Sequence, residues 1–342
     1  TTVVLDIQVH VGRTGALTPI AHLKPVEIGG VTVSRATLHN QDEIERLDVR
    51  IGDTVIVGRA GDVIPDVISV IRDLRSGKEK KFKMPLECPV CAELLTKTEG
   101  VILRCVNKKC PARSREYLYF FVSKRAFDIE RIGPKIIDQL VLTGLISTPA
   151  DLFDLKEGDL ISLERFGEKS AGNIIKAIEI SKDIPLDRFI YALGIRYVGE
   201  ETAADLAQYF GSIDNIENAS EDDIKNIPDI GPVVAKEIMS WFKSRRNRDF
   251  VRTLGEKGVR VEKPKHIGAK LKGKTFVFTG TFEKLTRQEA ERKVRMLGGD
   301  PSDSVSSQTD YAVVGESPGS KYDKARELGV KILSEEEFLK MI

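Results

Sequence analysis

Four cysteines constrain the fold of this chain more than any other feature of its sequence. The chain has 342 residues, and its cysteines all lie within one short segment, at Cys88, Cys91, Cys105 and Cys110. A C-x2-C spacing places two thiolates on one tight turn, and a second pair completes a tetrahedron around one ion. All four histidines lie far from this segment in the sequence, which favours an all-cysteine site. Because four protein ligands fill the coordination sphere of zinc, we expect one structural Zn²⁺.

Two other chemistries fit four clustered cysteines, namely two disulfides and an iron–sulfur cluster. The beginning of the chain lacks the charged and apolar regions of a secretion signal, which argues against disulfides. The sequence also contains no apolar run as long as a membrane helix needs. The chain starts with Thr1 and Thr2 rather than a methionine and enters an alternating apolar stretch at once. We therefore expect it to begin inside a larger protein.

The net charge of +1 conceals two oppositely charged regions. Residues 72–125 contain fourteen lysines and arginines against six acidic residues, whereas residues 128–229 contain ten against twenty-one. A neutral total with a basic block is typical of a protein that presents one face to a polyanion. A solvated, lysine-rich linker is the alternative interpretation.

The first 78 residues contain short apolar stretches separated by glycines. The predicted strands span residues 3–11, 26–28, 32–33, 54–58 and 63–70. Five short strands predict a small all-β barrel. Arg13 and Thr14 lie between Gly12 and Gly15, and Arg59 lies close to Gly61. Glycine permits close backbone approach and arginine offers a forked donor to phosphate. Taken alone, however, these segments favour the simpler interpretation of exposed arginines beside turn glycines.

An internal repeat predicts an all-α domain over residues 113–254. Four glycines, at 133, 167, 199 and 231, follow an apolar residue and precede a helical pattern, with spacings of 34, 32 and 32 residues. Such a period indicates one supersecondary unit used four times.

The repeated unit resembles the helix–hairpin–helix motif, which binds DNA without reading its sequence. In that motif the backbone N–H groups at the start of the second helix point to a phosphate. The candidate DNA contacts on matching positions are Arg131, Gly133, Lys135, Arg165, Gly167, Lys169, Gly199 and Gly231. The motif usually has a further glycine two places earlier, where this chain has Arg131, Arg165, Tyr197 and Asp229. We therefore expect the first two copies to contact DNA more than the fourth, and hairpins that serve only as scaffold are the alternative.

Residues 255–270 are a predicted linker, and residues 271–342 alternate strands with helices. This order predicts a parallel sheet covered by helices on both faces. The segment resembles a BRCT domain in its strings at residues 274–280, 298–299, 309–311 and 319–325. The resemblance implies a phosphate site at Thr279, Gly280 and Lys321, with Arg287 as a further candidate. A domain that only docks a partner protein is the alternative.

The order of these parts resembles the C-terminal half of bacterial NAD-dependent DNA ligase. Further strings that carry the resemblance lie at residues 11–15, 34–40, 50–53, 59–65, 163–171 and 193–199. The implied domains are an OB-fold barrel (1–78), a four-cysteine zinc finger (84–112), helix–hairpin–helix repeats (113–254), a linker (255–270) and a BRCT domain (271–342).

The resemblance also implies what this chain does. The family transfers AMP from NAD to a lysine of a K-x-D-G motif and then to the 5′-phosphate of a nick, in steps that use Mg²⁺. This sequence contains no K-x-D-G, so we expect it to carry no catalytic residue and to depend on an upstream adenylation domain. Its expected partner is nicked double-stranded DNA during replication and repair, and Arg13, Thr14 and Arg59 of the barrel would contact the backbone of that DNA. We further expect a monomer in the bacterial cytoplasm, associated with the nucleoid.

Two other classes of function use the same modules. A stand-alone DNA-binding adaptor without ligase activity is the first, and the missing methionine argues against it. A nuclease-associated scaffold is the second, and it would not explain the barrel strings.

Overall fold

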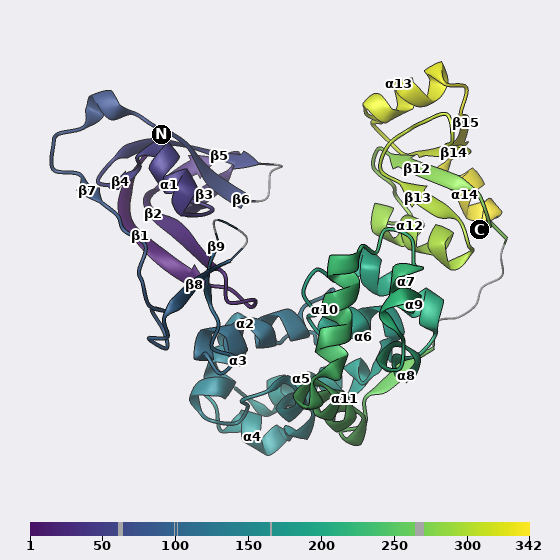
Figure 1. Ribbon diagram of the computed structural model, residues 1–342, viewed down its shortest axis with the longest axis horizontal. Helices are drawn as coiled ribbons and strands as arrows, with labels where there is room; N and C mark the ends of the chain where they lie inside the picture. Colours follow the sequence, from purple (N-terminus) through teal and green to yellow (C-terminus); the bar gives the residue numbers. More distant parts are fainter. Residues whose placement is uncertain (61–63, 99, 101, 165, 264–269) are drawn as a thin grey trace. The chain divides into compact units, whose positions relative to one another are not determined.

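The computed structural model describes residues 1–60, 64–98, 100, 102–164, 166–263 and 270–342. The chain divides into two compact units. One unit is formed by Thr1–Ala204 with Asp214–Glu262, and the other by Asp205–Ile213 with Lys263–Ile342. The first unit contains a barrel, a cysteine-rich module and a helical region, and the second contains a parallel sheet (Figure 1).

A closed five-stranded barrel forms the beginning of the first unit, which confirms the predicted OB-type barrel. Its strands occur in the order β1 (Thr2–Val11), β2 (Leu17–Ile28), β3 (Val31–Thr37), β6 (Ile64–Val70) and β5 (Thr54–Ala60). Strands β3 and β6 pair in parallel, and the other neighbours are antiparallel. Strand β2 begins nine residues before the predicted 26–28 segment, and Val63 of the predicted last strand lies outside the described residues.

One helix and one buried carboxylate complete the barrel. Helix α1 (Gln41–Leu47) was not predicted, and it contributes Ile44 and Leu47 to the barrel core. The carboxylate of Asp53 is almost fully buried and accepts hydrogen bonds from Arg75 Nε at 2.7 Å and from the Arg50 N–H at 2.8 Å. A buried charge is stable only with such partners, so Asp53 fixes the turn between β4 (Arg50–Ile51) and β5.

The cysteine-rich module follows the barrel. After a short helix η1 (Arg72–Leu74), strand β7 (Lys80–Lys81) pairs with β4, and β8 (Leu95–Thr98) forms a hairpin with β9 (Ile102–Cys105). The module ends at α2 (Pro111–Val122), which has proline at its first position.

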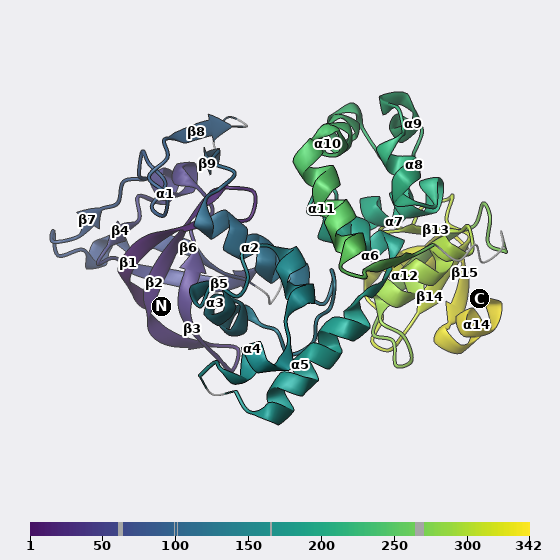
Figure 2. The ribbon, with the colours of Figure 1, turned by 90° about the horizontal axis from the view of Figure 1, so that it is seen from below.

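The helical region consists of short helices, and an aromatic cluster packs in the part that contains α2, η2 and α6. Its elements are α3 (Pro134–Leu142), η2 (Pro149–Asp154), α4 (Glu157–Ile161), α5 (Glu168–Ser181), α6 (Leu186–Ala192), α7 (Glu200–Phe210), α8 (Ile213–Glu217), α9 (Glu221–Lys225), α10 (Pro232–Lys243) and α11 (Arg245–Glu256). The rings of Phe121 and Phe127 stack with centroids 4.1 Å apart, and Phe153 and Phe189 pack around them. Figure 2 shows α2 to α6 from a second direction.

The segment predicted as a linker begins with ordered structure. Gly255 and Glu256 end α11, and β11 (Arg260–Glu262) pairs in parallel with β10 (Asp183–Pro185). Residues 264–269 of the predicted linker lie outside the described residues.

The second unit contains a four-stranded parallel sheet with the order β13 (Asp300–Ser302), β12 (Thr275–Thr279), β14 (Tyr311–Val314) and β15 (Lys331–Ser334). Helices α12 (Arg287–Met296) and α14 (Glu335–Met341) cover one face, where Phe276, Phe278 and Phe338 pack. Helix α13 (Ser320–Glu327) covers the other face through Ala325. This arrangement confirms the predicted α/β domain. Among the described residues, no helix is both long and apolar enough to cross a membrane.

Candidate metal centre and nucleic-acid interface

The structure brings the four predicted cysteine ligands together. Cys88 and Cys91 lie on a tight turn closed by a hydrogen bond from the Ala92 N–H to the Cys88 carbonyl, and Ala92 adopts a left-handed conformation. Cys105 ends β9, and Cys110 is the N-cap residue of α2. All four sulfur atoms lie within 4.8 Å of one another.

The geometry of these sulfurs fits a tetrahedral metal. The Sγ atoms are 3.8 Å apart for Cys88 and Cys110 and 3.5 Å apart for Cys91 and Cys105. Zinc–sulfur bonds of about 2.3 Å place tetrahedral sulfurs about 3.8 Å from one another, whereas a disulfide needs about 2.05 Å. The cysteines are accordingly free thiols rather than two disulfides.

The surroundings of two of the sulfurs disfavour the thiolate form in the absence of a cation. Burial raises the pKa of Cys105 to about 12 and also raises the pKa of Cys110. A hydrogen bond involving the backbone of Glu93 lowers the pKa of the more exposed Cys91 to about 7. Four thiolates become stable together only when a metal ion balances their charge.

The four repeat glycines occupy equivalent positions at helix starts. Gly133, Gly167 and Gly231 are the N-cap residues of α3, α5 and α10, and Gly199 directly precedes α7. None of the four has a positive φ, and a Cβ added at any of them would meet no other atom within 4 Å. Neither backbone conformation nor internal packing therefore requires glycine at these positions.

The residues two places earlier adopt the conformation that glycine would favour. Arg131, Tyr197 and Asp229 have φ values of 67°, 65° and 64°. The corresponding Arg165 of the second copy lies outside the described residues. The hairpins thus keep one backbone shape although non-glycine residues occupy this left-handed position, which costs about 1–2 kcal/mol each.

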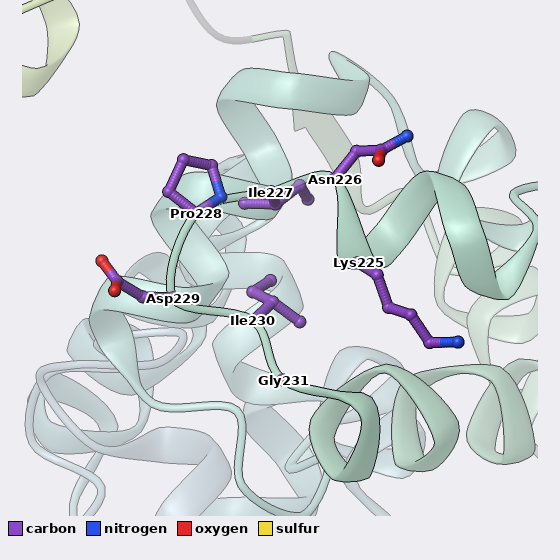
Figure 3. Close-up of a pocket in the computed structure, with 7 residues that line it drawn as sticks. All are labelled: Lys225, Asn226, Ile227, Pro228, Asp229, Ile230 and Gly231. Atoms are coloured by element: carbon purple, nitrogen blue, oxygen red, sulfur yellow. The ribbon is translucent and has the colours of Figure 1, made fainter.

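The charged candidates of the hairpins lie on the surface, and their signs differ. Arg131, Lys135 and Lys169 are exposed. In the fourth hairpin, Asp229 projects outward from the turn, while the buried side chains of Ile227 and Ile230 lie on the inner side of the turn (Figure 3). Lys225 of that hairpin forms ion pairs with Glu221 and Asp222, so the fourth copy presents less free positive charge than the first.

The candidate residues of the barrel differ in their positions. Nη1 of Arg13 donates a hydrogen bond to the carbonyl of Gly194 at 2.6 Å, and burial lowers the pKa of this guanidinium. The Thr14 hydroxyl accepts a hydrogen bond from Arg104 at 3.0 Å. Arg59 lies in β5 opposite Pro65 of β6. Arg13 therefore points toward the helical region, and its partner Gly194 carries no sequence signal that would have predicted the contact.

Three of the four phosphate candidates in the second unit lie near one end of the sheet. The Thr279 hydroxyl accepts a hydrogen bond from the N–H of Gly319, the N-cap residue of α13, at 3.3 Å, and Lys321 lies in the first turn of that helix. Gly280 has a φ of 86° and no room for a Cβ beside the Glu316 carbonyl.

The fourth candidate, Arg287, is engaged by acidic residues. It forms ion pairs with Glu291 at 2.9 Å and with Asp303 at 3.0 Å. These contacts would have to open before Arg287 could bind a phosphate.

The described residues thus form a multidomain protein with a barrel, a four-cysteine centre, repeated hairpins with open helix starts and a terminal parallel sheet. Residues 1–79 match the family described as the NAD-dependent DNA ligase OB-fold domain. Residues 124–179 match the SAM-like helix-hairpin-helix tandem, and residues 188–251 match the helix-hairpin-helix motif. Residues 267–342 match the BRCA1 C-terminus (BRCT) domain.

Curated relatives match the whole chain. A DNA ligase of Halothermothrix orenii is 53% identical over 348 residues, covering 100% of this chain and 52% of the relative. A DNA ligase of Geobacter metallireducens is 50% identical, covering 100% of this chain and 51% of the relative. The chain thus spans about half the length of the curated relatives it matches. Together these findings show that it belongs to the NAD-dependent DNA ligase family and corresponds to a C-terminal portion of such a protein.

Proposed function

We propose that this chain is the part of an NAD-dependent DNA ligase that grips nicked duplex DNA, while a separate adenylation domain performs the chemistry. The observation that carries this proposal is the set of four repeat glycines with open space around them. Because neither backbone conformation nor packing among the described residues requires glycine there, we attribute its use to a ligand outside the protein. Backbone N–H groups at a helix start bind phosphate oxygens, and the absence of a side chain allows DNA to approach them.

The remaining candidates supply charge around these helix starts. Arg131, Lys135 and Lys169 are exposed beside the first two hairpins, and we assign them, with Arg165, to phosphate contacts. Thr14 and Arg59 are assigned to the DNA backbone at the barrel. Thr279, Gly280 and Lys321 form the proposed phosphate site of the BRCT domain, with Arg287 as an additional ligand once its ion pairs open.

We assign Zn²⁺ to the four-cysteine centre as a structural ion. Four thiolates leave no open coordination position for water or substrate, so this ion would shape the protein rather than take part in ligation. NAD and Mg²⁺ belong to the full-length enzyme in this account. Nick sealing in replication and repair would then require the adenylation domain in addition to this chain.

Fluorescence anisotropy with a nicked duplex tests the binding proposal. Each neutralised phosphate contributes a slope of about −0.9 to the dependence of log K on log salt. Four hairpin contacts therefore predict roughly a hundredfold weaker binding at 200 mM salt than at 50 mM. An intact duplex of the same sequence measures the preference for the nick. Equal affinity at both salt concentrations would rule out this mode of binding.

A ligation assay tests the division of labour. The chain with NAD, Mg²⁺ and nicked DNA should yield no sealed product, whereas a full-length enzyme that contains an adenylation domain should seal the nick. Sealing by the chain alone would overturn the proposal that its chemistry comes from elsewhere.

A further inference from the structure

We propose that Arg13 and Gly194 form a latch that holds the barrel against the base of the third hairpin (residues 195–199), so that both surfaces are aligned before DNA binds. Arg13 is in this account a positioning residue inside the protein, in addition to any contact that the barrel loop makes with DNA. The consequence for DNA affinity rests on the function proposed above, whereas the latch itself is a property of the free protein.

The Arg13 side of the latch is a guanidinium enclosed by the helical region. Its Nη1 donates to the Gly194 carbonyl at 2.6 Å across 181 residues of sequence. Its Cζ lies 4.1 Å from the centroid of the Phe120 ring of α2. Arginine is suited to this combination because its planar fork stacks on an aromatic face while it donates in the same plane.

The Gly194 side is shaped to receive this guanidinium. Gly194 has a φ of 67°, and a Cβ built on it would overlap Nη1 of Arg13 and approach Tyr117 Cε2 to 3.1 Å. The Tyr117 hydroxyl donates to the Ala192 carbonyl at 3.1 Å, which holds the end of α6 in place. Glycine is therefore required here by the arginine of another domain, unlike the glycines of the hairpin helix starts.

The loop that carries Arg13 (residues 11–15) also contacts the metal module, through Thr14 and Gly15. The Cys105 N–H donates to the Gly15 carbonyl at 2.9 Å, and a Cβ on Gly15 would overlap the Cys105 carbonyl oxygen. Nη1 of Arg104 donates to the Thr14 hydroxyl at 3.0 Å. Residues 11–15 thus connect the barrel, the metal module and the third hairpin within five residues.

The latch has a direct consequence for binding. Two surfaces that must engage one duplex bind it less well when their relative orientation varies, because only the aligned fraction is competent. If loss of the latch reduces the aligned fraction to about a tenth, the apparent Kd for nicked duplex rises about tenfold.

Single-molecule fluorescence energy transfer on the full chain tests the latch without DNA. Donor and acceptor dyes are attached through noncanonical amino acids at the exposed positions Leu5 on β1 and Ile180 on α5. The unaltered chain should give one narrow distribution. Arg13→Ala should broaden it into several states, and Arg13→Lys should also broaden it because lysine keeps the charge but lacks the fork. An Arg13→Ala distribution as narrow as that of the unaltered chain would overturn the proposal.

Two further variants separate the latch from a loss of charge. Arg35→Ala removes an exposed arginine of the same barrel and should leave the distribution narrow. Gly194→Ala removes no charge, yet it should broaden the distribution and raise the Kd for nicked duplex about tenfold. If Gly194→Ala preserves both the narrow distribution and the affinity, the latch is refuted, and Arg13 acts on DNA alone.

The two proposals fail in different ways. If the unaltered chain does not bind nicked duplex, the proposed function is wrong, but the energy-transfer distributions in free protein still decide the latch. If the chain binds DNA and Arg13→Ala leaves the free protein rigid, the latch is wrong while the proposed function stands.

Discussion

The hairpin glycines and the glycines of the junction between barrel, metal module and helical region differ in what a side chain would meet there. At Gly133, Gly167 and Gly231 an added Cβ meets nothing within 4 Å, and φ is negative. At Gly15 and Gly194 φ is positive, and an added Cβ overlaps an atom of a distant segment.

This difference separates two reasons for the same residue. The junction glycines are required by the folded protein, because the left-handed backbone and the close approach of another segment exclude other residues. At the hairpin glycines the backbone conformation and the open space would accept other residues, and we attribute the use of glycine there to the proposed DNA contact. Changes at the junction should therefore cost stability, and changes at the hairpins should cost only DNA affinity.

We expect the largest effect from removal of the metal, because this disrupts the junction at which Gly15 packs against Cys105. Structural zinc sites contribute roughly 10–16 kcal/mol of apparent binding free energy, and Cys105 is both a candidate ligand and the contact of Gly15. Chelation should unfold residues 84–112 and loosen the barrel loop, as measured by amide hydrogen exchange. Because the ligands must be thiolates, the apparent metal affinity should fall as the pH is lowered. Restored protection on addition of zinc is the control, and unchanged exchange in metal-free protein would contradict the assignment.

We expect the next largest effect at Gly15, and substitution of Gly12 in the same loop is its control. Gly15→Ala places a Cβ on the Cys105 carbonyl at a φ of 83°, and should lower the free energy of unfolding by about 3 kcal/mol from strain and overlap. Gly12→Ala meets only the Ala16 carbonyl at 3.6 Å, and should change it by less than about 1 kcal/mol. Urea denaturation of the zinc-loaded chain measures both. Equal values for the two variants would show that the junction is not crowded as described.

The smallest effect is a pH dependence at the junction. His10 of β1 lies 3.4 Å from Glu116 of α2, and the hydrogen bond to Glu116 raises the pKa of His10. The ion pair that forms when His10 is protonated should therefore stabilise the fold below a pH of about 6.5. This contribution should disappear as the pH rises through the elevated pKa of His10. Because both groups are partly exposed, we expect about 0.5 kcal/mol or less. His10→Gln should abolish this part of the pH profile, and an unchanged profile would exclude the pair as its source.

The sequence predicted those parts of the molecule that depend on local pattern. The alternation of residues 1–78, the 32-residue glycine repeat and the strand–helix order of residues 271–342 each predicted an element type that the structure confirms. The C-x2-C turn and the second cysteine pair likewise predicted the cluster of sulfurs. Such features follow from spacing along the chain, where backbone geometry fixes which side chains share a face.

The features that escaped prediction depend on distant partners. Helix α1 was missed because its seven residues carry only two buried apolar side chains, Ile44 and Leu47. The inward position of Arg13 depends on Gly194 and Phe120 in other domains, and no periodicity of the chain connects them. The buried Asp53 carboxylate depends in part on Arg75, which reaches it across 22 residues of sequence.

The most direct test of the account replaces hairpin glycines by aspartate. Aspartate is a favourable N-cap residue, so Gly133→Asp with Gly167→Asp should leave the free energy of unfolding unchanged or slightly higher. The same carboxylates should repel phosphate and weaken binding of nicked duplex at least about a hundredfold, since a charge-assisted contact is worth about 1.5–3 kcal/mol. Gly158→Asp, which adds one carboxylate at another open glycine in α4, is the control for each single substitution and should bind almost as the unaltered chain does. A folded double variant that binds nicked duplex as tightly as this control would contradict the claim that the open hairpin glycines exist for DNA.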